Sequence, residues 1–125
     1  MIQQFTIDTR LPGLNEYILA DRGNRFGGAK MKKTAQREVE YYIQAARLKR
    51  LRTPIRLVYT FYEPNRRRDK DNIAGFAHKV IQDALVAQRV IDDDGWQYIA
   101  GWTDAFAVDK ERPRIEVTLI EQGEG

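Results

Sequence analysis

Residues 55–85 read IRLVYTFYEPNRRRDKDNIAGFAHKVIQDAL, and this stretch indicates the fold class. Its first part places a large apolar side chain at every second position: Ile55, Leu57, Tyr59 and Phe61. This alternation is typical of a strand that buries one face, and Pro64-Asn65 then turns the chain. Apolar residues recur every three or four positions between Ile73 and Leu85, as on one face of a helix. We therefore predict a strand over 55–62 and a helix over 72–88.

The flanking sequence repeats these two patterns. Further strands are predicted over 3–8, 98–103, 106–108 and 115–120, and a further helix over 29–49. Residues 11–17 are rich in turn formers, and residues 21–28, with three glycines, suggest a flexible basic loop. The order strand, helix, strand, helix, strands indicates an α/β fold in which a small sheet is packed by two main helices. We expect a single domain over residues 1–125.

Composition excludes several classes of protein. The chain has 125 residues and no cysteine, which excludes disulfides and thiolate metal sites and fits a cytoplasmic protein. No apolar run approaches the roughly 20 residues that span a bilayer, so no membrane partner is expected. Met1–Asp8 lacks the basic start and apolar stretch of a signal peptide. We expect at least one of Trp96 and Trp102 to be buried in the core.

Positive charge is concentrated in two places, although the net charge is only +3. Ten basic residues lie between positions 22 and 52: Arg22, Arg25, Lys30, Lys32, Lys33, Arg37, Arg47, Lys49, Arg50 and Arg52. A second cluster is Arg66-Arg67-Arg68. Such a surface attracts polyanions, so nucleic acid is an expected partner. A solvated helix face explains the same charges equally well.

An acidic segment stands directly beside the second basic cluster. Asp69 and Asp71 are two positions apart, so their side chains project to the same side of an extended segment. Two neighbouring carboxylates repel each other, and a hard divalent cation relieves that conflict. Asp94, or its neighbour Asp93, could complete the site from the acidic turn at 92–94. With one histidine and no cysteine in the chain, Mg²⁺ or Mn²⁺ is favoured over zinc.

The same residues also have a purely structural explanation. Asp71 is a good N-cap for the helix that follows, and Asp69 suits a turn. Asp92-Asp-Asp-Gly95 is an ordinary turn composition. Lys79 lies on the helix eight residues after Asp71, where it could reach a bound phosphate or simply be solvated.

Three motifs follow one another along the chain: Arg66-Arg-Arg-Asp-Lys-Asp-Asn72, Lys79-x-x-x-Asp83-Ala-Leu85 and Val90-Ile-x-Asp-Asp94. Together they resemble the signature of the RusA family of Holliday-junction resolvases. The resemblance extends from the first strand through Leu11-Pro-Gly-Leu-Asn15 to the last strand. It implies a mixed β-sheet, a homodimer, a Mg²⁺ or Mn²⁺ cofactor and a four-way DNA junction as substrate. Members of the family are frequent in phages and prophages.

The resemblance also implies roles for individual residues. Asp69, Asp71 and Asp94 would be the catalytic, metal-binding carboxylates, with Asp93 as the alternative to Asp94, and Lys79 would be the essential lysine. In the familiar pattern that lysine follows the aspartate pair after four residues, whereas here it follows after eight. The difference is one helical turn, about 6 Å.

The predicted function is therefore a metal-dependent endodeoxyribonuclease that resolves Holliday junctions in DNA recombination or repair. The residues expected to contact DNA are Arg66, Arg67, Arg68, Lys30, Lys32, Lys33 and Asn15. A DNA-binding module without catalysis, a phosphohydrolase acting on small phosphate esters, and a less selective flap or fork nuclease stay open as alternatives.

Overall fold

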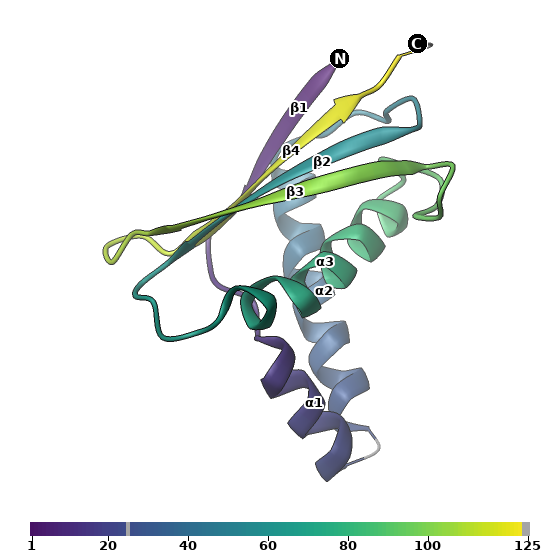
Figure 1. Ribbon diagram of the computed structural model, residues 1–125. Coiled ribbons are helices and arrows are strands. Elements are labelled where there is room, and N and C mark those ends of the chain that lie inside the picture. Colours follow the sequence, from purple (N-terminus) through teal and green to yellow (C-terminus); the bar gives the residue numbers. More distant parts are fainter. Residues whose placement is uncertain (25, 124–125) are drawn as a thin grey trace.

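A computed structural model describes residues 1–24 and 26–123 of the chain. The elements in chain order are β1 (Ile2–Ile7), α1 (Leu14–Gly23), α2 (Gly27–Ala45), β2 (Ile55–Glu63), α3 (Lys70–Ala87), β3 (Ile99–Val108) and β4 (Arg114–Glu121). The helices lie on one side of a twisted sheet, and α1 extends away from it against α2 and α3 (Figure 1). Arg25, one of the ten basic residues of the 22–52 cluster, lies outside the described residues.

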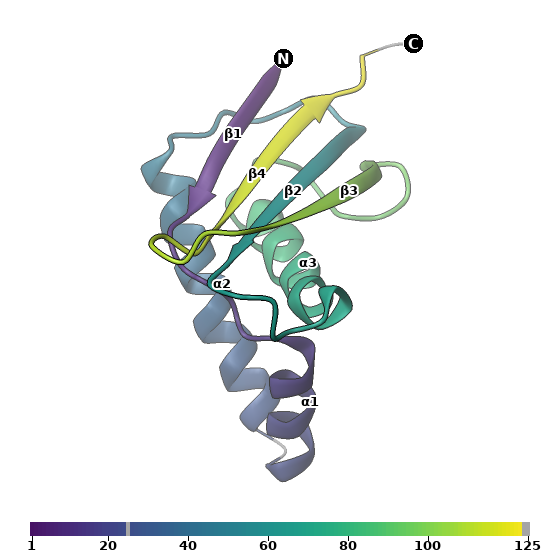
Figure 2. The same ribbon diagram turned by 60° about the vertical axis from the view of Figure 1, so that its left-hand side comes forward.

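The sheet is mixed, with strand order β1-β4-β2-β3. β4 runs antiparallel to both β1 and β2, whereas β3 runs parallel to β2. Parallel neighbours need a crossover connection, and α3 provides it (Figure 2). The first turn of α3 consequently lies near the carboxyl ends of β2 and β3, which is the edge where open α/β sheets bind ligands. The predicted fold class, a small mixed sheet packed by helices, is confirmed.

The core forms where the apolar faces of β2 and α3 meet. The alternating residues of β2 are almost completely buried, as predicted, and the apolar face of α3 packs on them; the largest of these buried side chains are Ile55, Leu57, Tyr59, Phe61, Ile81 and Leu85. Glu63 occupies the next inward position of β2 and is only 5% exposed. A carboxylate at a core position requires compensating partners, which are described below.

The region between β1 and α2 differs from the prediction. Residues 21–23 belong to α1, and Gly27 and Gly28 begin α2, so the expectation of a loop over 21–28 was wrong for these five residues. Among the described residues, only Asn24 and Phe26 lie between the helices. Contacts with α3 stabilise α1, because the ring of Tyr17 stacks on Phe76 at 4.7 Å between centroids. These contacts come from distant sequence, so local composition does not report them.

The region from Trp96 to the end of β3 also differs from the prediction in two respects. The two pieces predicted at 98–103 and 106–108 form one continuous strand at the edge of the sheet. The expectation that a tryptophan is buried was wrong, since Trp96 is 100% exposed and Trp102 is 45% exposed. An edge strand has a neighbour on one side only, which leaves Trp102 partly uncovered. None of the helices in the described part of the chain has the length and apolar composition needed to cross a bilayer.

Candidate active site

The two aspartates of the Asp-x-Asp motif lie at the amino end of α3. Asp69 is the N-cap residue, with extended backbone angles, and Asp71 lies in the first turn. Both line an open cleft of about 740 Å³, together with the cationic side chains of Arg66 and Lys70. Ile73 and Phe106 contribute apolar surface to the same cleft. The structure thus brings the predicted carboxylate pair and part of the predicted basic cluster into one concave site.

Helix capping does not account for this pair. The side chain of Asp69 makes no capping hydrogen bond to α3, although the residue occupies the N-cap position. Asp71 Oδ1 accepts a hydrogen bond from the backbone N–H of Asn72 at 2.9 Å. Both residues are exposed and lie at the positive end of the helix dipole, where negative charge is stabilising. Asp69 in particular is left available to a ligand.

The donor set of the cleft fits a hard divalent cation only in part. Among the described residues, no three histidine, cysteine, aspartate or glutamate side chains are grouped closely enough to hold a metal ion. Mg²⁺ in enzymes is commonly held by one or two carboxylates, with waters and substrate phosphates completing an octahedral shell. Asp69 and Asp71 suit that pattern, in which the DNA itself supplies further oxygens.

Lys79 and Asp94 form a separate group further along α3. Lys79 Nζ lies 3.1 Å from Asp83 Oδ1 and 3.5 Å from Asp94 Oδ2. The backbone of Lys79 is about 12 Å beyond Asp71 along the helix axis, since the two are eight residues apart. The structure therefore places two of the four predicted catalytic residues in the cleft and pairs the other two with each other.

The carboxylate of Asp83 holds this second group together. Asp83 Oδ2 accepts a hydrogen bond from Lys32 Nζ at 2.6 Å, so two lysines share one carboxylate. Burial raises the pKa of Asp83, but the hydrogen bonds from Lys32 and Lys79 outweigh it and the net pKa lies below its usual value. The hydrogen bond to Asp83 raises the pKa of Lys79. Asp93 is exposed, and its Oδ1 accepts the N–H of Asp94 at 2.8 Å within the turn.

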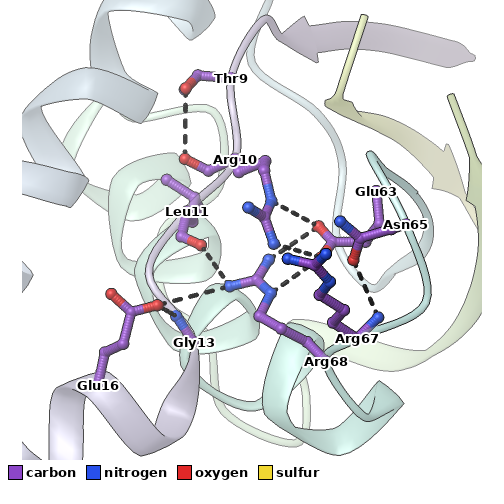
Figure 3. Close-up of polar contacts among 9 residues, drawn as sticks. All are labelled: Thr9, Arg10, Leu11, Gly13, Glu16, Glu63, Asn65, Arg67 and Arg68. Atoms are coloured by element: carbon purple, nitrogen blue, oxygen red, sulfur yellow. Dashed lines mark hydrogen bonds and ion pairs between the residues drawn. The ribbon is translucent and has the colours of Figure 1, made fainter. Parts of the chain in front are cut away.

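The arginine triplet divides into two exposed members and one buried in an ion-pair network. Arg66 and Arg67 are exposed, whereas the side chain of Arg68 is 16% exposed. Arg68 grips Glu63 with two parallel hydrogen bonds, Nε to Oε1 at 2.9 Å and Nη2 to Oε2 at 2.8 Å (Figure 3). Arg10 donates to the same carboxylate at 2.7 and 3.2 Å. Burial raises the pKa of Glu63, but these guanidinium contacts prevail and lower it overall.

The sequence patterns do not identify Glu63 and Arg10 as neighbours of the site. One signal was present, because Glu63 continues the inward-facing positions of β2 and precedes three arginines. Arg10 carries no such signal, since its contact spans 53 positions of sequence.

The remaining predicted DNA contacts lie on α1 and α2. Lys30 and Lys33 are exposed on α2, while Lys32 is paired with Asp83. The backbone N–H of Asn15 donates to Asn72 Oδ1 at 2.8 Å, which ties the start of α1 to the start of α3.

His78 is more enclosed than a typical surface histidine. Its Nε2 lies 2.8 Å from Asp104 Oδ1 on β3, and its side chain is 18% exposed. The imidazole ring lies 4.8 Å from the ring of Tyr59 and 5.1 Å from that of Trp102, measured between centroids. This contact links the middle of α3 to the edge strand.

Comparison with known proteins identifies the family. A profile of the family described as Endodeoxyribonuclease RusA matches residues 13–120, from the residue that precedes α1 into β4. None of the curated proteins compared with the chain matches it at a significant level. The matched segment contains every predicted site residue, from Asn15 to Asp94. Because the match covers most of the chain and the mixed α/β fold agrees with it, the chain belongs to the RusA family and is an endodeoxyribonuclease.

Proposed function

We propose that this endodeoxyribonuclease is a Mg²⁺-dependent resolvase that cuts four-way DNA junctions by paired phosphodiester hydrolysis, in recombination or repair. The observation that carries the proposal is the cleft at the start of α3, where Asp69 and Asp71 stand beside Arg66 and Lys70. Phosphodiester hydrolysis needs a metal ion next to the scissile phosphate and cations along the rest of the backbone. A carboxylate pair within a cationic rim meets both needs.

In this proposal each group in the cleft has a separate task. Asp69 and Asp71 hold the ion, with Mn²⁺ as a substitute for Mg²⁺. The bound ion supplies a Lewis acid and an activated water at the phosphate. Arg66, Arg67 and Lys70 attract the flanking phosphates as exposed cations. A junction cut symmetrically needs two such clefts, so we expect a two-fold homodimer. A cytoplasmic location also stays a prediction.

Asp94 and Lys79 enter the proposal with a condition. Asp94 is paired with Lys79 at 3.5 Å, and a partly exposed pair of this length adds little stability. Asp94, or Asp93 beside it, would join the aspartate pair as a third ligand only if the 92–98 turn moves toward the amino end of α3. Lys79 would keep its closer contact with Asp83, at 3.1 Å, and its role at the phosphate stays a prediction. We expect Asp94→Asn to lower cleavage, and native cleavage by that variant would restrict the metal site to Asp69 and Asp71.

The central test is Asp71→Asn, assayed on a labelled four-way junction with and without Mg²⁺. We expect the variant to lose cleavage and to bind the junction as tightly as the native chain or more tightly, since a negative charge near DNA has been removed. Asp92→Asn is the matched control, because Asp92 is an exposed acid paired with Arg50. Full nicking by Asp71→Asn would contradict the metal site.

The substrate is tested with a panel of junction, flap and linear duplex. Preferential cutting of the junction supports a resolvase, and equal cutting of flaps supports a less selective fork nuclease. Tight binding that ignores divalent ions, with no cleavage of any substrate, supports a DNA-binding module.

A further inference from the structure

Two of the segments that carry the family resemblance contact each other in the fold. Leu11–Asn15 runs from the connection after β1 into the first turn of α1, and Arg68–Asn72 runs from the connection after β2 into the first turn of α3. They meet at two points, each joining residues 57 positions apart. One contact lies immediately before Asp69 and the other immediately after Asp71. The residues on either side of the Asp69–Asp71 stretch, Arg68 and Asn72, are therefore both held by the Leu11–Asn15 segment.

The first contact is made by Arg68. Its Nη1 donates to the carbonyl oxygen of Leu11 at 3.2 Å, while its other two nitrogens grip Glu63 (Figure 3). Arg10, adjacent to Leu11, donates to both oxygens of the same carboxylate. Bidentate guanidinium contacts fix orientation as well as charge, and Glu63 is anchored at the end of β2. The residue directly before Asp69 thus has little freedom to rotate.

The second contact is made by Asn72. Its Oδ1 accepts the N–H of Asn15 at 2.8 Å, one of the backbone donors that the first turn of α1 leaves without a helical partner. Gly13 makes this approach possible, because a Cβ at that position would lie 2.7 Å from Asn72 Oδ1. Glu16 Oε1 accepts the Gly13 N–H at 3.1 Å and closes the turn. Asn72 is in this way fixed by backbone geometry on α1.

We infer that Leu11–Asn15 is a positioning segment, which sets the direction of the Asp69 and Asp71 carboxylates through Arg68 and Asn72. Arg68 and the Asn15 backbone then act within the protein and not on DNA, in contrast to Arg66 and Arg67. The inference rests on the proposed function, in which those carboxylates hold the ion. Groups that orient metal ligands typically change metal affinity or activity by about 10–100-fold when they are removed.

Gly13→Ala tests the contact at Asn72, and Gly23→Ala is its control. A Cβ at Gly23 meets no atom within 4 Å, so that variant should behave as the native chain. Gly13→Ala should speed hydrogen exchange of the amides of 73–76, the first that bond within α3, beginning with Ile73 N–H to the Asp69 carbonyl, while leaving β2 and β4 protected. It should also weaken Mn²⁺ binding, followed by titration without DNA, and lower the cleavage rate about tenfold or more. Junction affinity measured without divalent ions should stay unchanged.

Arg68→Lys tests the contact at Glu63. A lysine keeps the positive charge but loses the planar fork. If Arg68 positions Asp69, Arg68→Lys should lower kcat with little change in junction Kd. Its cleavage rate should then be hardly higher than that of Arg68→Ala. If Arg68 contacts phosphate instead, Arg68→Lys should retain cleavage, and Arg68→Ala should weaken binding and flatten its salt dependence. Arg67→Ala is the reference for that second behaviour, with an expected slope change of about 0.9.

The outcomes separate this inference from the proposed function. Native hydrogen exchange at 73–76 in both Gly13→Ala and Arg68→Lys overturns the positioning role, even if Asp71→Asn is inactive. Conversely, full cleavage by Asp71→Asn removes the metal site, while the exchange measurement still reports whether Leu11–Asn15 fixes the segment.

Discussion

Glu63 shows how a single ionised side chain can be accommodated at a core position. Removing a carboxylate from water is costly, and one opposing cation seldom compensates fully. Here Arg10 and Arg68 approach the two oxygens from different segments and supply four hydrogen bonds between them. The carboxylate gains enough from these contacts to stay ionised, which is why its pKa is lowered despite burial.

This arrangement predicts how stability depends on pH. A carboxyl group whose pKa is lower in the folded state stabilises the fold above its unfolded pKa, near 4.5 for Glu63. That contribution is lost as the pH falls through the folded value. We therefore expect the free energy of unfolding, measured with urea, to fall between about pH 6 and pH 3. Glu63→Gln should be less stable at neutral pH and show a shallower fall, and a curve parallel to the native one would contradict this assignment.

The strands and the two long helices follow from periodicity in the sequence, whereas α1 does not. β2 and α3 bury the side chains that their patterns predict, because burial of one face creates those patterns. α1 has no fully buried residue and depends on Asn72 and Phe76, which arrive from α3. β3 looked like two pieces because its edge position leaves exposed residues where a central strand would be apolar. Elements fixed by distant partners leave little local signal.

The corner between α1 and α2 gives a prediction about a turn. A Cβ at Gly27 would lie 2.5 Å from the carbonyl oxygen of Ala20, and a backbone atom cannot move aside cheaply. We expect Gly27→Ala to lower the free energy of unfolding by about 1–3 kcal/mol, the usual range for overpacking. Urea denaturation followed by circular dichroism would measure it. Gly23→Ala in the same corner should be neutral, and equal losses in both variants would point to a general effect of replacing glycine.

For the protein as a whole, the sequence predicts where charge gathers but not which charges are already paired. Asp69 and Asp71 were predicted as a pair and do share the cleft. Arg68 and Lys32 were grouped with their neighbours, yet each is bound to a carboxylate. Arg68 binds Glu63 at the end of β2, five positions earlier, and Lys32 binds Asp83 on α3, 51 positions later. Spacing along one segment cannot reveal such pairings. The separation of Asp94 from the cleft could not be read from spacing either. The cleft lies at the amino end of α3, whereas the turn that carries Asp94 follows the carboxyl end of that helix.

Two adjacent lysines on α2 allow the DNA-binding contributions of an exposed and a carboxylate-bound lysine to be compared. Lys33 is exposed, whereas Lys32 is bound to Asp83 at 2.6 Å. If α2 contacts phosphates, Lys33→Gln should weaken junction binding and reduce the slope of log K against log salt by about 0.9. Lys32→Gln should change that slope less, although both variants lose one charge. Binding isotherms at several salt concentrations would show it, and identical slopes in both variants would exclude a role for the Asp83 pairing.

The edge position of β3 has a consequence for how copies of the chain meet. An outer strand offers unpaired main-chain groups to any passing strand, which is a route to fibres. β3 presents Asp104 toward the helix side of the sheet, where His78 holds it. A carboxylate pointing inward on an outer strand discourages a further strand from joining, because the enlarged sheet would enclose that charge. The His78–Asp104 contact thus allows β3 to remain an unpaired edge strand without promoting aggregation.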